Sequence, residues 1–233
     1  MKTLLAFAFA LAGLLARPAL AVPTVVEAEY QISTAGIAIG RVHETFVRKG
    51  GTYRIESTTR AEGVFRLFRD DTVVIESEGR FGPKGLEPLR FEQRRAGDAS
   101  RDISAAFDWE KSQMRSSYRG EDSVHPLPPG TQDRLSVMYQ FMNLPATAER
   151  VRLPMSNGRK VDFYTYRKVD EPRLATPAGD FETAHYERVV DSEKENRAQL
   201  WLARDRFNLP VRVVFEDTKG LKLEQTIVSL RTR

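Results

Sequence analysis

The feature that most constrains this chain is a period-two alternation of apolar and polar side chains between turn residues. Within one such segment, a single face would carry Ile103, Ala105, Phe107 and Trp109. Successive side chains of a β-strand point to opposite sides of the sheet, so this alternation predicts strands with one face on a core. Turn residues recur about every ten residues along the chain, a spacing typical of an all-β meander.

Glycine-containing turns separate most of the predicted strands. Gly50-Gly51 and residues 82–85 are each predicted to join two strands into a hairpin. Asn157-Gly158 predicts a type I′ turn, in which both residues take a positive φ. The alternation slips in residues 221–230, which predicts a β-bulge in that strand.

One segment departs from the strand pattern, because residues 131–142 predict a helix after a proline-rich stop. Thr131 is expected to cap its free amides, and Asp133 suits the positive end of the helix dipole. One face of this helix would be an apolar stripe made of Leu135, Met138, Tyr139 and Met142. A shorter helical turn is predicted at residues 64–69. A single apolar helix among many strands predicts a mainly β fold, in which a curved antiparallel sheet, a half-barrel or open barrel, wraps around that helix.

The N-terminal segment, residues 1–21, has the layout of a secretory signal peptide. It has a basic residue at position 2, an apolar stretch, and small residues at the cleavage-determining positions Ala19 and Ala21. A membrane anchor is the alternative, but Arg17 and Pro18 interrupt an apolar run that is already short for a bilayer. We therefore expect cleavage after Ala21 and a single all-β exported domain at residues 22–233, soluble in the periplasm.

Composition excludes several classes of chemistry. The chain has no Cys, which excludes disulfides, thiol nucleophiles and thiolate zinc sites. Cleavage would remove two of its 36 basic residues, against 32 acidic ones, so the exported chain is nearly balanced in charge and no nucleic-acid partner is expected. No P-loop, dinucleotide-binding glycine pattern or nucleophile elbow is present. We therefore expect no cofactor, no catalytic residues and no enzymatic activity.

Metal binding is weakly suggested at one place only. His185 and Glu187 lie two residues apart in a predicted strand, which is the minimum geometry for two ligands on one face. No third ligand is visible in the sequence, so a histidine hydrogen-bonded to a neighbour is the preferred interpretation. We expect no metal site.

Three segments in order carry a family resemblance: residues 127–141 (LPPGTQDRLSVMYQF), 176–189 and 200–215. Together they resemble an exported bacterial family of uncharacterised function, domain of unknown function 3108, over nearly all of the mature chain. The last strands are also remotely similar to periplasmic lipoprotein carriers and lipid-sensing regulators. That similarity implies a curved half-barrel around helices, with an apolar ligand cavity. The family brings no established catalytic residues.

Two hypotheses remain open for the candidate binding residues. Asp133 and Arg134 at the start of the helix either hold the helix to the sheet or form a polar gate that binds a ligand head group. A second group of apolar residues either fills the core or lines a pocket for an acyl chain: Phe65, Phe68, Met138, Tyr139, Phe141 and Met142. Aromatic and basic residues in 65–69 allow at most peripheral membrane contact.

The leading functional hypothesis is non-enzymatic binding of a lipid or other apolar or amphipathic small molecule in a concave β-sheet. One alternative is an envelope assembly or structural factor, whose exposed strand edge pairs with an envelope protein. Another is an envelope hydrolase with a dispersed site.

Overall fold

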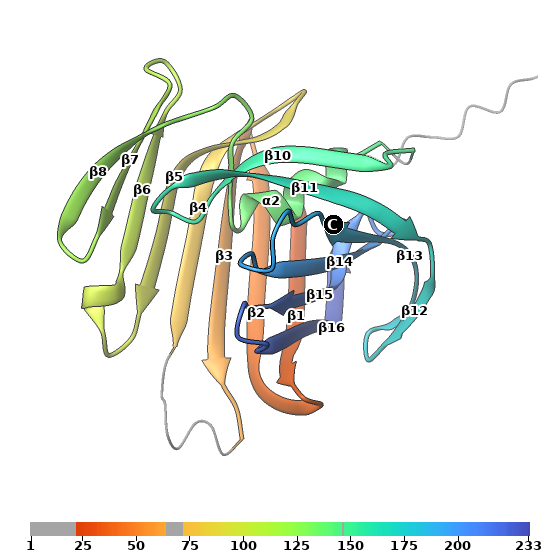
Figure 1. The fold of residues 1–233 in the computed structure, drawn as a ribbon. Coiled ribbons are helices and arrows are strands. Elements are labelled where there is room, and N and C mark those ends of the chain that lie inside the picture. The colour runs from red at the N-terminus through yellow and green to blue at the C-terminus, as the bar shows by residue number, and fades with distance from the viewer. Residues whose placement is uncertain (1–21, 64–71, 146) are drawn as a thin grey trace, which may run out of the picture.

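The computed structural model describes residues 22–63, 72–145 and 147–233. The predicted signal peptide and the predicted helical turn at residues 64–69, with Phe65 and Phe68, lie outside these ranges. Most of the described chain is strand, as the period-two alternation predicts (Figure 1).

Strands occur in two runs, one on each side of the helical segment. The first run is β1 (Val25–Thr34), β2 (Ile37–Lys49), β3 (Thr52–Ala61), β4 (Val73–Gly82), β5 (Gly85–Arg95), β6 (Ile103–Asp108), β7 (Gln113–Tyr118) and β8 (Glu121–Pro126), with a 3₁₀ turn, η1 (Ala99–Arg101), before β6. The second run is β9 (Gln132–Asp133), β10 (Arg150–Ser156), β11 (Val161–Asp170), β12 (Arg173–Thr176), β13 (Gly179–Arg188), β14 (Arg197–Ala203), β15 (Leu209–Glu216) and β16 (Lys222–Thr232).

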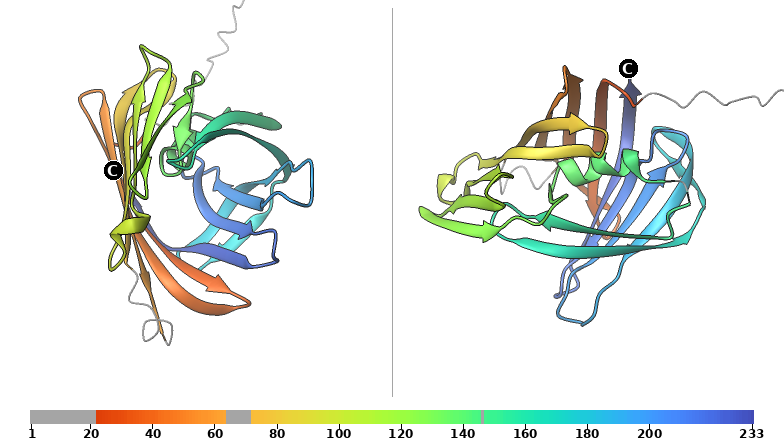
Figure 2. Two further views of the ribbon diagram at one scale, coloured as in Figure 1. Left: turned by 60° about the vertical axis from the view of Figure 1, so that its left-hand side comes forward. Right: turned by 90° about the horizontal axis from the view of Figure 1, so that it is seen from above.

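All of these strands belong to one continuous, open sheet. Its order is β8-β7-β6-β5-β4-β3-β2-β1-β16-β15-β14-β13-β11-β10-β9, and β12 pairs with β13. Neighbouring strands are antiparallel except β9 and β10, which are parallel. Among the described strands, β8 and β9 lie at the two ends of this order and do not pair, so the sheet does not close. Figure 2 shows β1–β8 as a broad wall, with β10–β16 curling away from it and the helix held between the two halves. The predicted curved antiparallel sheet around one apolar helix is confirmed.

The helix is shorter than predicted. It consists of α2 (Ser136–Gln140) followed by the 3₁₀ turn η2 (Phe141–Asn143), and the residues before it form β9 and a tight corner. The Asp133 carboxylate accepts hydrogen bonds from the backbone amides of Leu135 (2.8 Å) and Ser136 (2.9 Å). Asp133 therefore satisfies the amide of Ser136, the first residue of α2, and the amide of Leu135 just before it. Thr131 is not the cap, because its hydroxyl donates to the Pro128 carbonyl (2.7 Å).

The predicted turns occur where expected, with one difference in conformation. Gly50 and Gly51 have positive φ values of 58° and 80° between β2 and β3. Between β10 and β11 only Gly158 has a positive φ (85°), so the type I′ geometry predicted for Asn157-Gly158 is wrong. Asn157 instead uses its side-chain oxygen to accept from the amides of residues 159 and 160, which makes a wider turn.

The predicted bulge in the last strand is confirmed. The register between β1 and β16 pairs Glu29 with Ser229 and Tyr30 with Ile227, which leaves Val228 as the extra residue.

The core lies on both sides of α2. Tyr139 stacks on Phe46 of β2, with ring centroids 4.7 Å apart, and belongs to a cluster with the wall strands. Val137 and Phe141 pack into a second cluster with the curled half, which includes Leu200. Ser136, Val137 and Tyr139 of α2 are buried, and the helix joins the two halves of the sheet.

Candidate functional site

The concave face of the wall carries two adjacent rows of side chains that form the floor of a trough. Cross-strand pairing from β1 to β5 places in the first row Tyr30, Val42, Thr59, Val73 and Arg95. Pairing from β2 to β7 places in the second row Glu44, Ser57, Ile75, Gln93, Ile103 and Tyr118. We call the space above these rows the concave trough.

The inner end of the concave trough is a hollow of about 160 Å³ beside α2. Its roof comes from the corner before α2, from α2 itself and from β15, and includes Leu135, Met138 and Val213. Its floor includes Tyr30 and Val42 from the first row. The lining also includes polar and charged side chains, among them Glu44, Ser57 and Gln225, so the inner hollow combines apolar and polar surface.

The outer end is a larger hollow of about 400 Å³. Side chains from strands, turns and the corner before α2 converge on it, among them Arg95, Arg101, Arg134, Arg159 and Tyr118. The two hollows share Thr59, Ile75 and Arg134 as lining residues, so they are adjoining parts of one trough.

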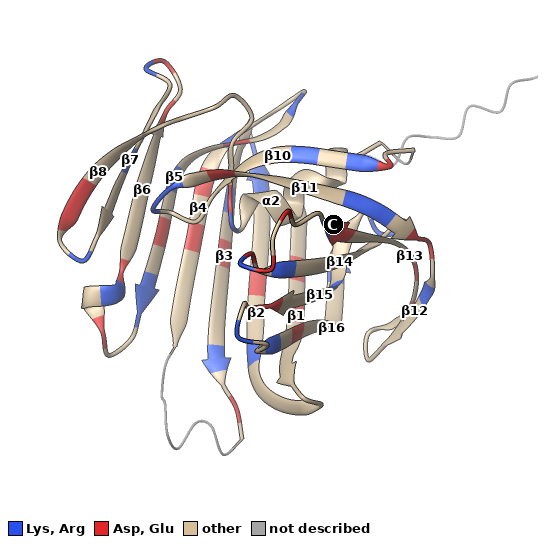
Figure 3. Cartoon of the chain, viewed as in Figure 1, with Lys and Arg blue, Asp and Glu red and all other residues tan. Residues whose placement is uncertain are grey.

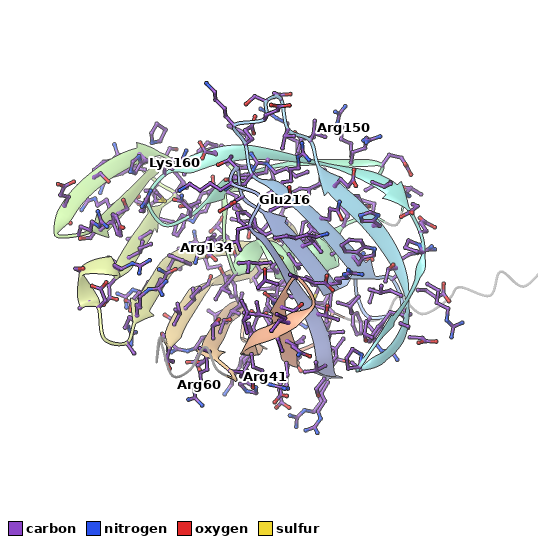
Figure 4. All side chains as sticks on the ribbon, turned by 60° about the horizontal axis from the view of Figure 1, so that its bottom comes forward. Arg41, Arg60, Arg134, Arg150, Lys160 and Glu216 are labelled. Carbon is purple, nitrogen blue, oxygen red and sulfur yellow. The ribbon has the colours of Figure 1, made fainter. Side chains whose placement is uncertain are left out.

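Arg134 lies where the two hollows meet (Figure 4). Its Nη2 donates to Oε1 of Gln93 on the sheet floor at 2.5 Å. The Arg134 residue is exposed to solvent. Desolvation by neighbouring protein atoms lowers the pKa of its guanidinium, and the charge of Asp133 acts in the opposite direction. The hydrogen-bond partner of Arg134 is therefore the side-chain amide of Gln93 rather than a carboxylate, and Arg134 borders both hollows.

Asp133 is fully buried and does not line the trough. Besides the two helix amides, it accepts a hydrogen bond from Oγ of Ser77 on β4 at 2.5 Å. Burial raises the pKa of its carboxyl, although these hydrogen bonds act in the opposite direction. Asp133 therefore caps α2 and ties the corner before it to the wall.

The other predicted binding residues are divided between the trough and the core. Met138 lines the inner hollow. Tyr139 is buried against Phe46, and Met142 packs against the same cluster, so neither lines the hollow. Arg134 and Met138 are thus the two predicted residues that the structure brings together at the trough.

Glu44 is a buried carboxyl at the inner end that sequence reasoning missed. It lines the inner hollow, and Oη of Tyr139 donates to its Oε1 at 2.8 Å. Burial raises the pKa of Glu44, while hydrogen bonds from Tyr139 and Ser57 lower it. Burial is the largest cause, and it also raises the pKa of the neighbouring Tyr30 hydroxyl.

This raised pKa predicts a pH-dependent stability difference between the wild type and Glu44→Gln. The folded state holds the Glu44 proton more tightly than the unfolded state, whose pKa is about 4.3. Wild-type stability therefore falls relative to Glu44→Gln as pH rises from the unfolded pKa through the raised folded pKa. Urea unfolding of both proteins between pH 4 and pH 8 measures this difference. A difference that is constant, or that moves in the opposite direction, contradicts it.

His185 has the hydrogen-bonded neighbour that the sequence favoured. Its Nδ1 lies 3.0 Å from Oδ1 of Asp170, and its ring stacks on Trp201 with centroids 4.1 Å apart. Glu187 instead accepts a hydrogen bond from Gln199. No group of three His, Asp or Glu side chains in the described ranges is placed to hold a metal ion.

An open, curved β-sheet with a short apolar helix inside it and a trough on its concave face defines an open half-barrel protein. The chain belongs to the family described as Protein of unknown function (DUF3108), whose model matches residues 29–226. This confirms the resemblance carried by the segments from residue 127 onward. A search of curated proteins found no match.

Three solved structures are similar over 90% of this chain. They are a proposed lipoprotein from Parabacteroides distasonis (11% identity, 95% of its chain, TM-score 0.36) and a proposed exported protein with a YmcC-like fold from Bacteroides fragilis (13%, 96%, 0.38). The third is a proposed outer membrane lipoprotein-sorting domain from Vibrio parahaemolyticus (9%, 84%, 0.28). These likenesses are too distant to bear on function. No helix in the described part of the chain combines the length and hydrophobicity needed to cross a bilayer.

Proposed function

We propose that this protein is an exported, periplasmic, non-enzymatic protein that binds an apolar or amphipathic, lipid-like molecule in the concave trough. The signal-peptide pattern of residues 1–21 supports export. The absence of nucleotide-binding and nucleophile motifs from the sequence supports a binding role rather than catalysis.

The observation that carries the proposal is the unfilled inner hollow beside α2. Protein interiors are normally packed without large voids, so a hollow of about 160 Å³ next to the core, lined by Leu135, Met138 and Val213 as well as by polar side chains, is a place for a guest. An engineered apolar cavity of about 150 Å³ admits benzene, so the inner hollow takes the end of an apolar chain rather than a whole lipid. The combined volume of the inner and outer hollows lies in the range that is typical of small-molecule binding sites.

Native mass spectrometry of protein purified from its own envelope tests the proposal. The wild type should carry a bound lipid-like molecule. Met138→Trp fills the inner hollow and should lose most of this adduct, whereas Met138→Ala enlarges the hollow and should keep it. Thermal unfolding of both variants separates lost binding from lost folding.

Other outcomes of the same measurement favour the alternatives. A stoichiometric protein partner in place of lipid would favour an assembly factor. Turnover in a hydrolase panel, with neither lipid nor partner bound, would favour an enzyme. Equal lipid adducts on the wild type and on folded Met138→Trp would show that the trough is not the binding site.

A further inference from the structure

We propose that the outer hollow binds the phosphate group of an anionic amphiphile whose apolar end occupies the inner hollow. This inference rests on the proposed function and names the chemical class of its ligand.

Four arginines from separate elements converge on the outer hollow. Arg95 ends β5, Arg101 ends the η1 turn, Arg134 lies at the corner before α2, and Arg159 belongs to the turn between β10 and β11. None of the described residues that line this hollow is Asp or Glu. Guanidinium groups stay protonated at neutral pH, so four positive charges meet at the outer hollow, and that of Arg101 is partly balanced by Asp98 at 4.0 Å.

The arginines on the convex face of the same wall are arranged differently. Acidic and basic residues share strands β3 to β5 in Figure 3. There Arg54 pairs with Glu76 and Arg94 pairs with Glu92. Carboxylate neighbours are the usual way in which a sheet surface balances such charges.

Two of the trough arginines have other kinds of partner. Arg134 donates to the amide oxygen of Gln93, and the Arg159 guanidinium lies over the Tyr118 ring, 4.7 Å from its centroid. Neither makes an ion pair with a carboxylate of the described residues. The charge of Asp133 raises the pKa of Arg134, whereas the charge of Arg95 lowers it, since like charges disfavour one another. An anion between these groups would relieve that repulsion.

A phosphate fits this arrangement better than a smaller anion. Guanidinium groups bind phosphate oxygens through pairs of parallel hydrogen bonds, and one phosphate offers enough acceptors for several arginines. Arg134 borders the inner hollow as well, so a phosphate held there has an apolar space next to it. That juxtaposition favours an amphiphile over free phosphate.

Calorimetric titration of the delipidated protein with three probes tests the inference. The probes are dihexanoyl phosphatidic acid below its micellar concentration, uncharged dihexanoylglycerol, and inorganic phosphate. The phosphatidic acid should bind at least about tenfold more tightly than either other probe, since charged hydrogen bonds are added to apolar contact. Arg134→Gln and Arg159→Gln should each weaken it about tenfold, and Arg159→Gln should leave binding of dihexanoylglycerol unchanged because Arg159 lies outside the inner hollow.

Arg90→Gln is the matched control, because Arg90 is exposed on the same strand as Arg95 but outside the outer hollow. An equal loss with Arg90→Gln would overturn the inference, because bulk charge would then explain the binding. Equal affinity for the two amphiphiles would overturn it while leaving the proposed function intact. Equal affinity for phosphatidic acid and inorganic phosphate would overturn the amphiphile assignment. Binding of neither amphiphile would remove the proposed function itself.

Discussion

Replacing Asp133 with alanine should lower the free energy of unfolding by about 3–5 kcal/mol. The substitution leaves the amides of Leu135 and Ser136 without their acceptor and removes one of the two partners of the Ser77 hydroxyl, and all of these groups are buried. It also removes the cap of α2, the element that joins the two halves of the core. A loss of this size is a large part of the total stability of a domain, which is about 5–15 kcal/mol.

Urea unfolding followed by circular dichroism measures the Asp133 effect. Asp133→Asn keeps the size and one acceptor oxygen, so it should cost clearly less than Asp133→Ala. Ser77→Ala removes the hydrogen bond to Asp133 and the one between Ser77 and Tyr53, and should cost about 2 kcal/mol. If Asp133→Ala costs no more than Ser77→Ala, then Asp133 does not organise the corner before α2.

Gly158→Ala should destabilise the fold by about 2–5 kcal/mol, because backbone strain and overpacking add at this position. Gly158 has a φ of 85°. A Cβ there would lie 2.6 Å from Cγ2 of Ile103 and 2.8 Å from Cε1 of Phe91. Phe91 is fully buried, so its ring has little room to move. The turn between β10 and β11 is thus pressed against the concave face of the wall.

Gly120→Ala separates the two causes. Gly120 has a similar φ of 76°, but a Cβ there meets nothing within 4 Å. This control should cost about 1–2 kcal/mol, which is the backbone strain alone. Chemical denaturation of both variants gives the comparison, and equal losses would mean that Ile103 and Phe91 yield to the new methyl group.

The strands and most turns were predictable because their causes are local. Side-chain alternation in residues 103–109 and the glycine pair at 50–51 act over a few neighbours, and the structure agrees with both. The bulge in residues 221–230 was visible for the same reason. The helix start was mispredicted because Asp133 folds back on the amides after it, which apolar spacing alone does not reveal.

The trough was only partly predictable. Arg134 and Met138 were found because they lie on or next to one apolar helix. Arg95, Arg101 and Arg159 were missed, since cross-strand register and a distant turn bring them together and no sequence spacing relates them. Sequence reasoning did not single out Glu44, because it is one of several polar residues in a strand of alternating pattern. Its burial depends on Tyr139, which is far away in the sequence.

The pairing of β1 with β16 has a consequence for how the chain folds. Val26 lies opposite Thr232, and the amide of Thr24 donates to the carbonyl of Arg233 at 2.6 Å. The middle of the sheet is therefore a contact of very high sequence separation, and closing it costs loop entropy before it gains any hydrogen bonds. Such topologies fold in about milliseconds to seconds rather than microseconds. During synthesis, β1 has no partner on one side until β16 has left the ribosome.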